Sequence, residues 1–113
     1  MRRLSPIETQ IIGRLARALV ASGIPVRALR VFGSRARGHS TEQSDLDIAV
    51  EVASPPDPRL TRRVMELGRA LSLVPEDSCQ GLRVQAVPFF EGEEQSPLAR
   101  AIAPEAETVW TKT

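Results

Sequence analysis

The 113-residue chain combines 42% apolar with 26% charged residues at a formal net charge of +1, which excludes wholesale disorder and argues against direct nucleic-acid binding through a broad basic surface. Its length suits one domain over residues 1–113, with a single hydrophobic core. A lone cysteine excludes a disulfide framework, and the lack of a signal-peptide pattern or a membrane-length apolar run favours a cytoplasmic protein without membrane contact.

The predicted elements begin with a helix. Residues 5–8, Ser-Pro-Ile-Glu, form a capping box with proline in the first helical position, and apolar residues then recur at helical spacing as far as Leu19. Gly23 and Pro25 end this helix. A strand rich in β-branched and apolar residues is predicted over residues 26–32.

A polar loop over roughly residues 38–44 leads to a second strand over residues 45–52, whose apolar and polar residues alternate with the period of two that a sheet requires. The proline-rich residues 54–58 end that strand. Four further elements are predicted: a helix with one apolar face from Leu60 to Val74, a strand over residues 82–89, a short helix capped by Ser96 and running to about Ile102, and residues 107–110, either as an edge strand or as a segment that packs Trp110 on the core. This order predicts an α/β or α+β fold, a small mixed sheet with helices covering one side.

Asp45 and Asp47 are the first candidate site residues. Two residues apart on a strand, their side chains leave the same face, while Leu46 and Ile48 point into the core. Two carboxylates this close repel each other unless a cation lies between them. Mg²⁺ suits such oxygen ligands, because it binds one or two carboxylates and completes its shell with water and phosphate oxygens. The spacing therefore predicts a metal site that carries a nucleotide.

Gly33 and Ser34 stand where the preceding strand ends. The glycine permits a tight turn and lets phosphate oxygens approach backbone N–H groups closely, and the serine adds a hydroxyl donor. Arg35 and Arg37, one or both, would neutralise the phosphates, although they could equally be solvent-facing charges. We expect the following loop to fold the chain back, so that a phosphate clamp faces the metal clamp.

Residues 33–38, Gly-Ser-Arg-Ala-Arg-Gly, and residues 44–50, Ser-Asp-Leu-Asp-Ile-Ala-Val, together resemble the signature of the DNA polymerase β-like nucleotidyltransferase superfamily. That signature is Gly-Ser, ten residues, and then Asp-x-Asp. Within the superfamily the chain is most similar to the minimal nucleotidyltransferases, in which the catalytic domain stands nearly alone. The resemblance runs from the first helix to the third strand and implies the polymerase β-like fold.

The resemblance also implies a reaction. Asp45 and Asp47 would hold one or two Mg²⁺ ions on ATP or another NTP, and Gly33 and Ser34 would hold its terminal phosphates. An acceptor hydroxyl would attack the α-phosphate, and pyrophosphate would leave. Minimal nucleotidyltransferases often act beside a HEPN-domain protein as the antitoxin of a toxin–antitoxin pair, and characterised members transfer AMP to a tyrosine of that partner. A HEPN-like partner is therefore expected.

Gln85 departs from the family pattern. The family usually places a third carboxylate at the matching position, on the strand after the second helix, where it helps to bind metal and to deprotonate the acceptor. An amide cannot take a proton, and loss of a general base typically costs on the order of a hundred- to ten-thousand-fold in rate. Glu91 is a substitute candidate near the end of that strand, whereas Glu51 lies too far along the neighbouring one.

Three functions follow from these observations. The first is a Mg²⁺-dependent nucleotidyltransferase that acts on a hydroxyl of a partner protein. The second is a catalytically weak or inactive binding module of the same fold, which acts by contacting its partner, and Gln85 favours this alternative. Transfer to a small molecule stands last, because the aminoglycoside-modifying relatives usually carry a second domain to hold the drug.

Overall fold

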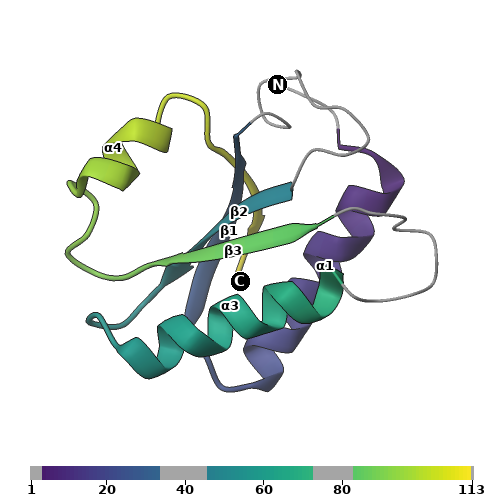
Figure 1. The fold of residues 1–113 in the computed structure, drawn as a ribbon, viewed down its shortest axis with the longest axis horizontal. Coiled ribbons are helices and arrows are strands. Elements are labelled where there is room, and N and C mark those ends of the chain that lie inside the picture. The colour runs from purple at the N-terminus through teal and green to yellow at the C-terminus, as the bar shows by residue number, and fades with distance from the viewer. Residues whose placement is uncertain (1–3, 34–45, 73–82, 113) are drawn as a thin grey trace.

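A computed structural model describes residues 4–33, 46–72 and 83–112 of the chain. Helices and strands alternate irregularly along it (Figure 1). The elements are α1 (Pro6–Ala21), β1 (Val26–Phe32), β2 (Leu46–Val52), α3 (Pro58–Ser72), β3 (Val84–Phe89), α4 (Pro97–Ile102) and β4 (Glu107–Thr111). All the predicted helices and strands are present. Three of their predicted end residues lie outside the described part of the chain: Asp45 and Leu82 at the starts of the second and third strands, and Val74 at the end of the second helix.

The four strands form one mixed sheet in the order β3-β2-β1-β4. β1 pairs antiparallel with β2 on one side and with β4 on the other, and β2 pairs parallel with β3 through the crossover that contains α3. The predicted small mixed sheet of an α+β fold is therefore confirmed. Residues 107–110 fulfil both alternatives, because they belong to the edge strand β4 and Trp110 packs against the core.

The start of α1 has the predicted capping box. The Ser5 hydroxyl accepts a hydrogen bond of 3.2 Å from the backbone N–H of Glu8, and the Glu8 carboxylate accepts one of 2.8 Å from the backbone N–H of Ser5. These two bonds satisfy N–H groups that a helix start otherwise leaves without partners. Gly23, at a φ of +77°, follows the end of α1 and turns the chain into β1.

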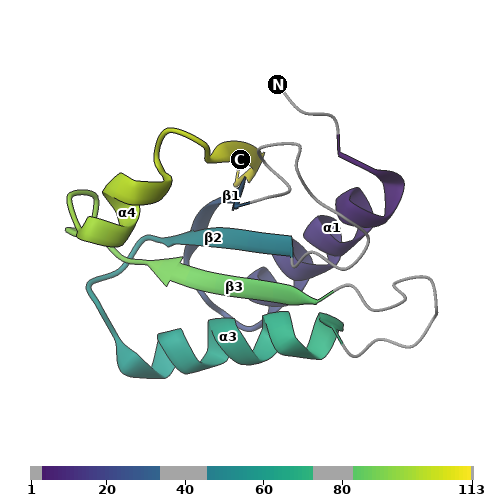
Figure 2. The same cartoon turned by 45° about the horizontal axis from the view of Figure 1, so that its top comes forward.

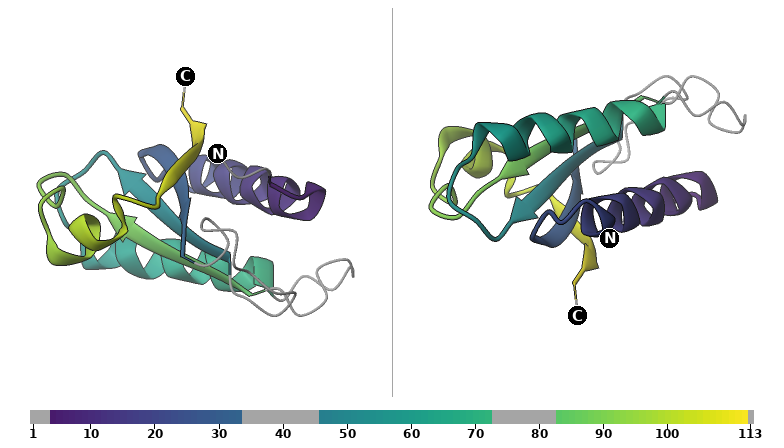
Figure 3. Two further views of the ribbon diagram at one scale, coloured as in Figure 1. Left: turned by 90° about the horizontal axis from the view of Figure 1, so that it is seen from above. Right: turned by 90° about the horizontal axis from the view of Figure 1, so that it is seen from below.

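The core lies between one face of the sheet and the helices α1 and α3. Seen from below, these two helices lie side by side in front of the sheet (Figure 3). Leu15 of α1, Leu29 of β1 and Ile48 of β2 have no exposed surface, and each such side chain contributes about 1.5–3 kcal/mol on burial. Val64 of α3 is also fully buried, as the predicted apolar face of that helix requires.

The short helix α4 departs from the prediction that helices cover one side. It stands near the opposite face of the sheet, away from α1 and α3 (Figure 2), and its Ala99 lines a pocket together with Ala49 and Glu51 of that face. With six residues and no buried side chain, α4 covers this second face only in part within the described residues, so that Ala49 is buried while Gln85 is exposed. No helix within the described ranges is long and apolar enough to cross a bilayer.

Candidate active site

The candidate site lies on the face of the sheet that α1 and α3 leave open. Along β2, Leu46, Ile48 and Val50 are fully buried on the core face, whereas on the other face Asp47 and Glu51 are only half-buried and the small Ala49 between them is buried. This alternation is the predicted one, because side chains of a strand leave it on opposite faces in turn. Asp47 therefore projects from the open face.

Strand pairing places two candidate residues beside Asp47. Phe32, the last residue of β1, pairs with Asp47 in the antiparallel register, and Gly33 follows it directly. On the other side, Gln85 of β3 pairs with Asp47 in the parallel register. Because paired residues project from the same face, Asp47 and Gln85 are neighbours on the open face.

Gly33 makes a turn that only a residue without a side chain fits well. Its φ is +82°, in the left-handed region that favours glycine. A Cβ at this position would overlap Oδ2 of Asp47 and lie 3.3 Å from its Cγ. The glycine turn and the carboxylate are thus in direct contact, which is the arrangement that the fold-back of the chain predicts.

The remaining predicted site residues lie outside the described residues. Ser34, Arg35, Arg37 and Asp45 all fall in the range 34–45. Their predicted roles, phosphate binding for the first three and metal binding for Asp45, stay predictions. The described half of the motif consists of Gly33 and Asp47.

Gln85 occupies the position expected for a third carboxylate. It is exposed on the open face, next to Asp47, while its neighbours Val84 and Ala86 are buried. An amide has no basic lone pair that could accept a proton at neutral pH, although its oxygen can accept a hydrogen bond. The side chain is therefore well placed to contact a ligand of Asp47 but lacks the chemistry of a general base.

Glu105 joins the site from the C-terminal part of the chain, and sequence reasoning missed it. Its Oε2 accepts a hydrogen bond of 2.7 Å from the backbone N–H of Gly33, and the bond is partly buried. Glu105 and Asp47 are thus two carboxylates in contact with the same glycine. The 72 residues that separate Glu105 from Gly33 leave no local pattern that indicates the contact.

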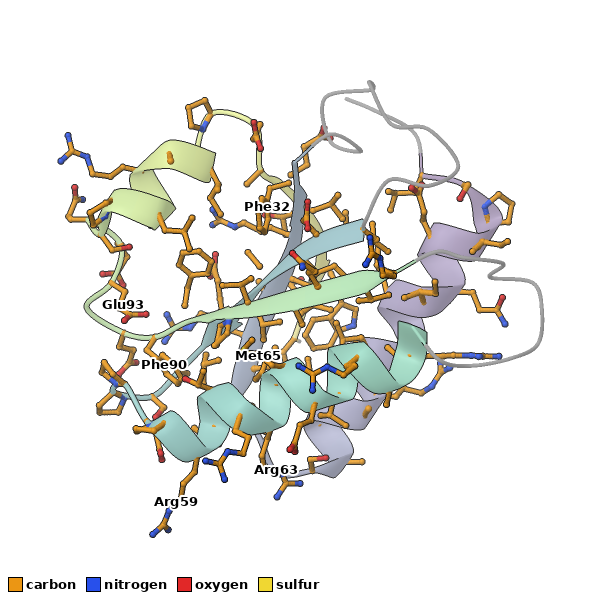
Figure 4. The ribbon with its side chains drawn as sticks, in the orientation of Figure 1. Phe32, Arg59, Arg63, Met65, Phe90 and Glu93 are labelled. Atoms are coloured by element: carbon orange, nitrogen blue, oxygen red, sulfur yellow. The ribbon has the colours of Figure 1, made fainter. Side chains whose placement is uncertain are left out.

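The prediction that Glu91 could substitute for the missing carboxylate is wrong. It follows the end of β3 that is remote from Gln85, about 13 Å along a strand at about 3.3 Å per residue, and its carboxylate pairs with Arg27 at 3.1 Å. Figure 4 labels Phe32 at the site end of the sheet, and Phe90 and Glu93 at the far end, where Glu91 lies between them in sequence.

Glu51 shares the open face with Asp47 but has another partner. Its Oε2 lies 2.7 Å from Nε of Arg30. The contact is an ion pair rather than an aligned hydrogen bond, because within the described part of the chain this Nε–H has no acceptor in line with it. Glu51 and Arg30 border a pocket of about 230 Å³ between α4 and the sheet. The expectation that Glu51 lies too far along β2 agrees with this position.

The chemistry of the described residues suits a hard cation at one point. Asp47 offers carboxylate oxygens, the donors that Mg²⁺ prefers, and the missing side chain of Gly33 leaves room for this carboxylate against the turn. No group of three or more acidic, histidine or cysteine residues with metal-binding geometry occurs in the ranges that the structure describes. Asp45, the other carboxylate of the predicted metal clamp, lies outside these ranges, so the metal site stays a prediction.

Comparison with known proteins agrees with this geometry. The family model described as a nucleotidyltransferase domain matches residues 12–104. No match was found among curated protein sequences.

Three solved structures similar to this chain come from toxin–antitoxin complexes. One, crystallised with AMP-PNP, has a chain that is 21% identical over 93% of this chain and 74% of its own length, with a TM-score of 0.63. A chain of a mutant MntA–HpeT toxin–antitoxin complex is 24% identical over 98% and 76%, with a TM-score of 0.60. A complex of a tri-AMPylated HEPN toxin from Shewanella oneidensis with its MNT antitoxin gives 19% over 94% and 71%, with a TM-score of 0.57.

Proposed function

We propose a function on the premise that this chain belongs to the nucleotidyltransferase domain family, as the match over residues 12–104 shows. The chain would transfer a nucleoside monophosphate, AMP from ATP, to a hydroxyl of a partner protein. The single observation that carries this proposal is the contact between the Gly33 turn and the Asp47 carboxylate on an open sheet face. A phosphate-binding turn and a metal-binding carboxylate have to meet in this way to act on one nucleotide.

The residue roles follow from this contact. Asp47, together with Asp45, would hold one or two Mg²⁺ ions, which neutralise phosphate charge when they are bound. The turn at Gly33 and Ser34 would cradle the terminal phosphates through backbone N–H and hydroxyl donors. Arg35 and Arg37 would add positive charge from the same segment.

The transfer is a displacement at the α-phosphorus atom. The acceptor hydroxyl oxygen forms a bond to this atom while the bond to the oxygen that bridges to the β-phosphate breaks. Pyrophosphate leaves with that electron pair, and the acceptor keeps the nucleoside monophosphate. The chain's contribution is to hold the phosphates and the acceptor in line, since positioning and electrostatics dominate this class of reaction.

Removal of the proton from the acceptor hydroxyl is the step for which the chain is least equipped. Gln85 lies beside Asp47, where a base would be useful, but its amide does not take up a proton. The proton would therefore pass to water or to a group outside the described residues. We expect slow turnover, below that of a relative with a carboxylate at this position by roughly a hundredfold.

A HEPN-like protein is the partner that we propose. The basis is the similarity to chains of solved toxin–antitoxin complexes, one of which contains a tri-AMPylated HEPN toxin with its MNT antitoxin. In this proposal the chain is the antitoxin-like member of the pair, and the acceptor is a tyrosine hydroxyl of the partner.

A binding module is the second candidate, and Gln85 is the observation that favours it. If turnover were lost altogether, the same fold could still neutralise a partner by contact. In that case a change at Asp47 would leave neutralisation intact, because it alters the open face without altering the core.

Incubation with ATP labelled at the α-phosphate, Mg²⁺ and the protein encoded by the neighbouring gene tests the proposal. We expect label on the partner, and we expect Gln85→Asp to increase its rate of appearance by about tenfold or more. Absence of label with the natural chain, under conditions where Gln85→Asp does transfer, would reject the enzymatic function for this sequence. Calorimetry of ATP binding with and without Mg²⁺ separately tests the nucleotide site.

A further inference from the structure

We infer that Glu105 is a positioning residue of the nucleotide site, which fixes the Gly33 turn against Asp47 from the C-terminal side of the sheet. The assignment of this site to a nucleotide rests on the proposed function, whereas the contact between Glu105 and Gly33 does not. Its basis is the 2.7 Å hydrogen bond from the Gly33 N–H to Oε2 of Glu105.

Glu105 binds Gly33 just beyond the point where the pairing between β1 and β4 stops. The last paired residues are Val31 and Glu107, and the same antiparallel register, continued by two residues, sets Gly33 opposite Glu105. The Glu105 backbone does not continue the ladder, because its N–H donates to the carbonyl of Ile102 at the end of α4 at 3.0 Å. Its side chain supplies the acceptor for Gly33 instead.

A carboxylate is a good acceptor at this position. The Gly33 N–H is partly buried and lies beyond the described end of the ladder, so it needs a partner in place of a strand carbonyl. Hydrogen bonds with an ionised partner are shorter and stronger than neutral ones. The bond therefore holds the backbone of Gly33 at the point where the chain leaves β1.

The bond from Glu105 also fixes the position of Gly33 relative to Asp47. On one side the Gly33 backbone is bound by Glu105, and on the other side it touches the Asp47 carboxylate. A turn released from Glu105 would be free to move relative to Asp47, and the phosphate and metal ligands would then lose their alignment. Displacements of about 1 Å are enough to reduce catalysis markedly.

Glu105 lies one residue beyond the segment that the family model matches, residues 12–104. Glu105 is thus outside the matched segment, whereas its partner Gly33 lies within it. The segment around Glu105 connects α4 to β4, and two backbone N–H groups, of Glu105 and Ala106, are bound to the carbonyl of Ile102. Glu105 is consequently held from its backbone as well as through its side chain.

The test compares three variants of the full chain. Glu105→Ala and Glu105→Met remove the acceptor, the second with little change of volume, whereas Glu105→Gln keeps an acceptor oxygen and removes only the charge. Glu107→Ala, two residues along the chain at the start of β4, is the matched control for loss of one acidic side chain in this region. Two quantities are measured: the hydrogen-exchange rate of the Gly33 amide by NMR, and the affinity for ATP with Mg²⁺ by calorimetry.

We expect Glu105→Ala and Glu105→Met to speed exchange of the Gly33 amide and to weaken ATP binding, each by roughly tenfold, the order expected for loss of a bond to a charged group. Glu105→Gln should stay within about threefold of the natural chain in both quantities, and so should Glu107→Ala. Rescue by glutamine distinguishes positioning from a general loss of stability. If Glu105→Ala does not fold, Glu105→Met supplies the same comparison.

Three results would overturn the inference. Equal weakening by Glu105→Gln and Glu105→Ala would mean that the charge itself contacts metal or nucleotide. Tighter ATP binding in any of the three variants would make Glu105 a competitor of the phosphates. Unchanged exchange of the Gly33 amide in Glu105→Met would show that the bond does not hold the turn. If the natural chain bound no ATP, the proposed function would fail, while the exchange rates would still decide whether Glu105 fixes the turn.

Discussion

The carboxylates at the two ends of the open sheet face have different neighbours. At the far end, each of two carboxylates meets an arginine: Glu51 lies 2.7 Å from Arg30, and Glu91 lies 3.1 Å from Arg27. At the site end, Asp47 contacts the turn at Gly33 and lies beside Gln85, and Glu105 binds the Gly33 backbone. Residues of the same type therefore meet different partners on one surface.

This difference indicates which end is suited to a ligand. Carboxylates paired with arginines gain little from a further cation, and partly exposed pairs of this kind contribute only about 0–1 kcal/mol to stability. In the proposed function, the carboxylate at the site end instead binds a cation whose other ligands include phosphate oxygens. The composition of the face alone would not distinguish the two ends, because both contain acidic side chains.

Matched changes at the two ends give the largest expected contrast. Asp47→Asn should reduce Mg²⁺-dependent label transfer on the order of a hundredfold or more, because it removes a charged ligand from the metal clamp. Glu51→Gln, four residues along the same strand and on the same face, should change the transfer rate less than about threefold, since it breaks only the pair with Arg30.

Rates of label transfer for both variants, normalised to folded protein by circular dichroism, provide the measurement. Equal losses in Asp47→Asn and Glu51→Gln would contradict the division of the face into a binding end and a paired end. Activity of Asp47→Asn at the natural level would argue against the metal clamp itself.

Substitution of either of two glycines by alanine is expected to have a smaller effect. Gly33 and Gly23 both have positive φ, +82° and +77°, so alanine at either position is strained by about 1–2 kcal/mol. A Cβ at Gly23 has no atom within 4 Å, whereas one at Gly33 would overlap the Asp47 carboxylate. We expect both variants to lower the free energy of unfolding, and only Gly33→Ala to weaken ATP binding.

Urea unfolding and calorimetry on Gly33→Ala and Gly23→Ala separate these two contributions. The difference in free energy of unfolding between the variants reports the overlap with Asp47, which we expect to add about 1 kcal/mol. If both alanine variants bound ATP equally well, the contact between the turn and Asp47 would have no role in the site.

The smallest effect is expected from Glu91→Gln at the far end. Both side chains of this pair are about half exposed, at 55% for Arg27 and 48% for Glu91, so solvent screens the attraction. We expect a change in the free energy of unfolding within about 0.5 kcal/mol and no change in label transfer. A loss of transfer in this variant would restore Glu91 as a candidate base and contradict its assignment to the paired end of the face.

Local patterns predicted the parts of the fold that are local in sequence. The capping box at Ser5 and Glu8 forms as expected, and the alternation along β2 gives the face of Asp47 without any tertiary information. Gly33 and Asp47 meet because two consecutive strands that pair antiparallel bring the end of the first beside the start of the second. The position of Gln85 beside Asp47 came from the family resemblance and agrees with the parallel register of β3.

Contacts that depend on the order of the strands in the sheet could not be predicted from the sequence. Nothing in residues 103–107 indicates that β4 joins the sheet beside β1, so the bond between Glu105 and Gly33 could not be predicted. Glu91 was misplaced because it lies six residues beyond Gln85, past the far end of β3. The face chosen by α4 was also unpredictable, since a helix of six residues has no apolar stripe that selects one.

The alternation along β2 also limits how relatives of this chain can diverge. Insertion of one residue within β2 would exchange its two faces beyond that point, burying carboxylates and exposing Ile48 or Val50 to water. Insertions between the two strands do not carry this penalty. Natural variants should therefore differ in the length of that connection while keeping the number of residues between Asp47 and Val52 constant.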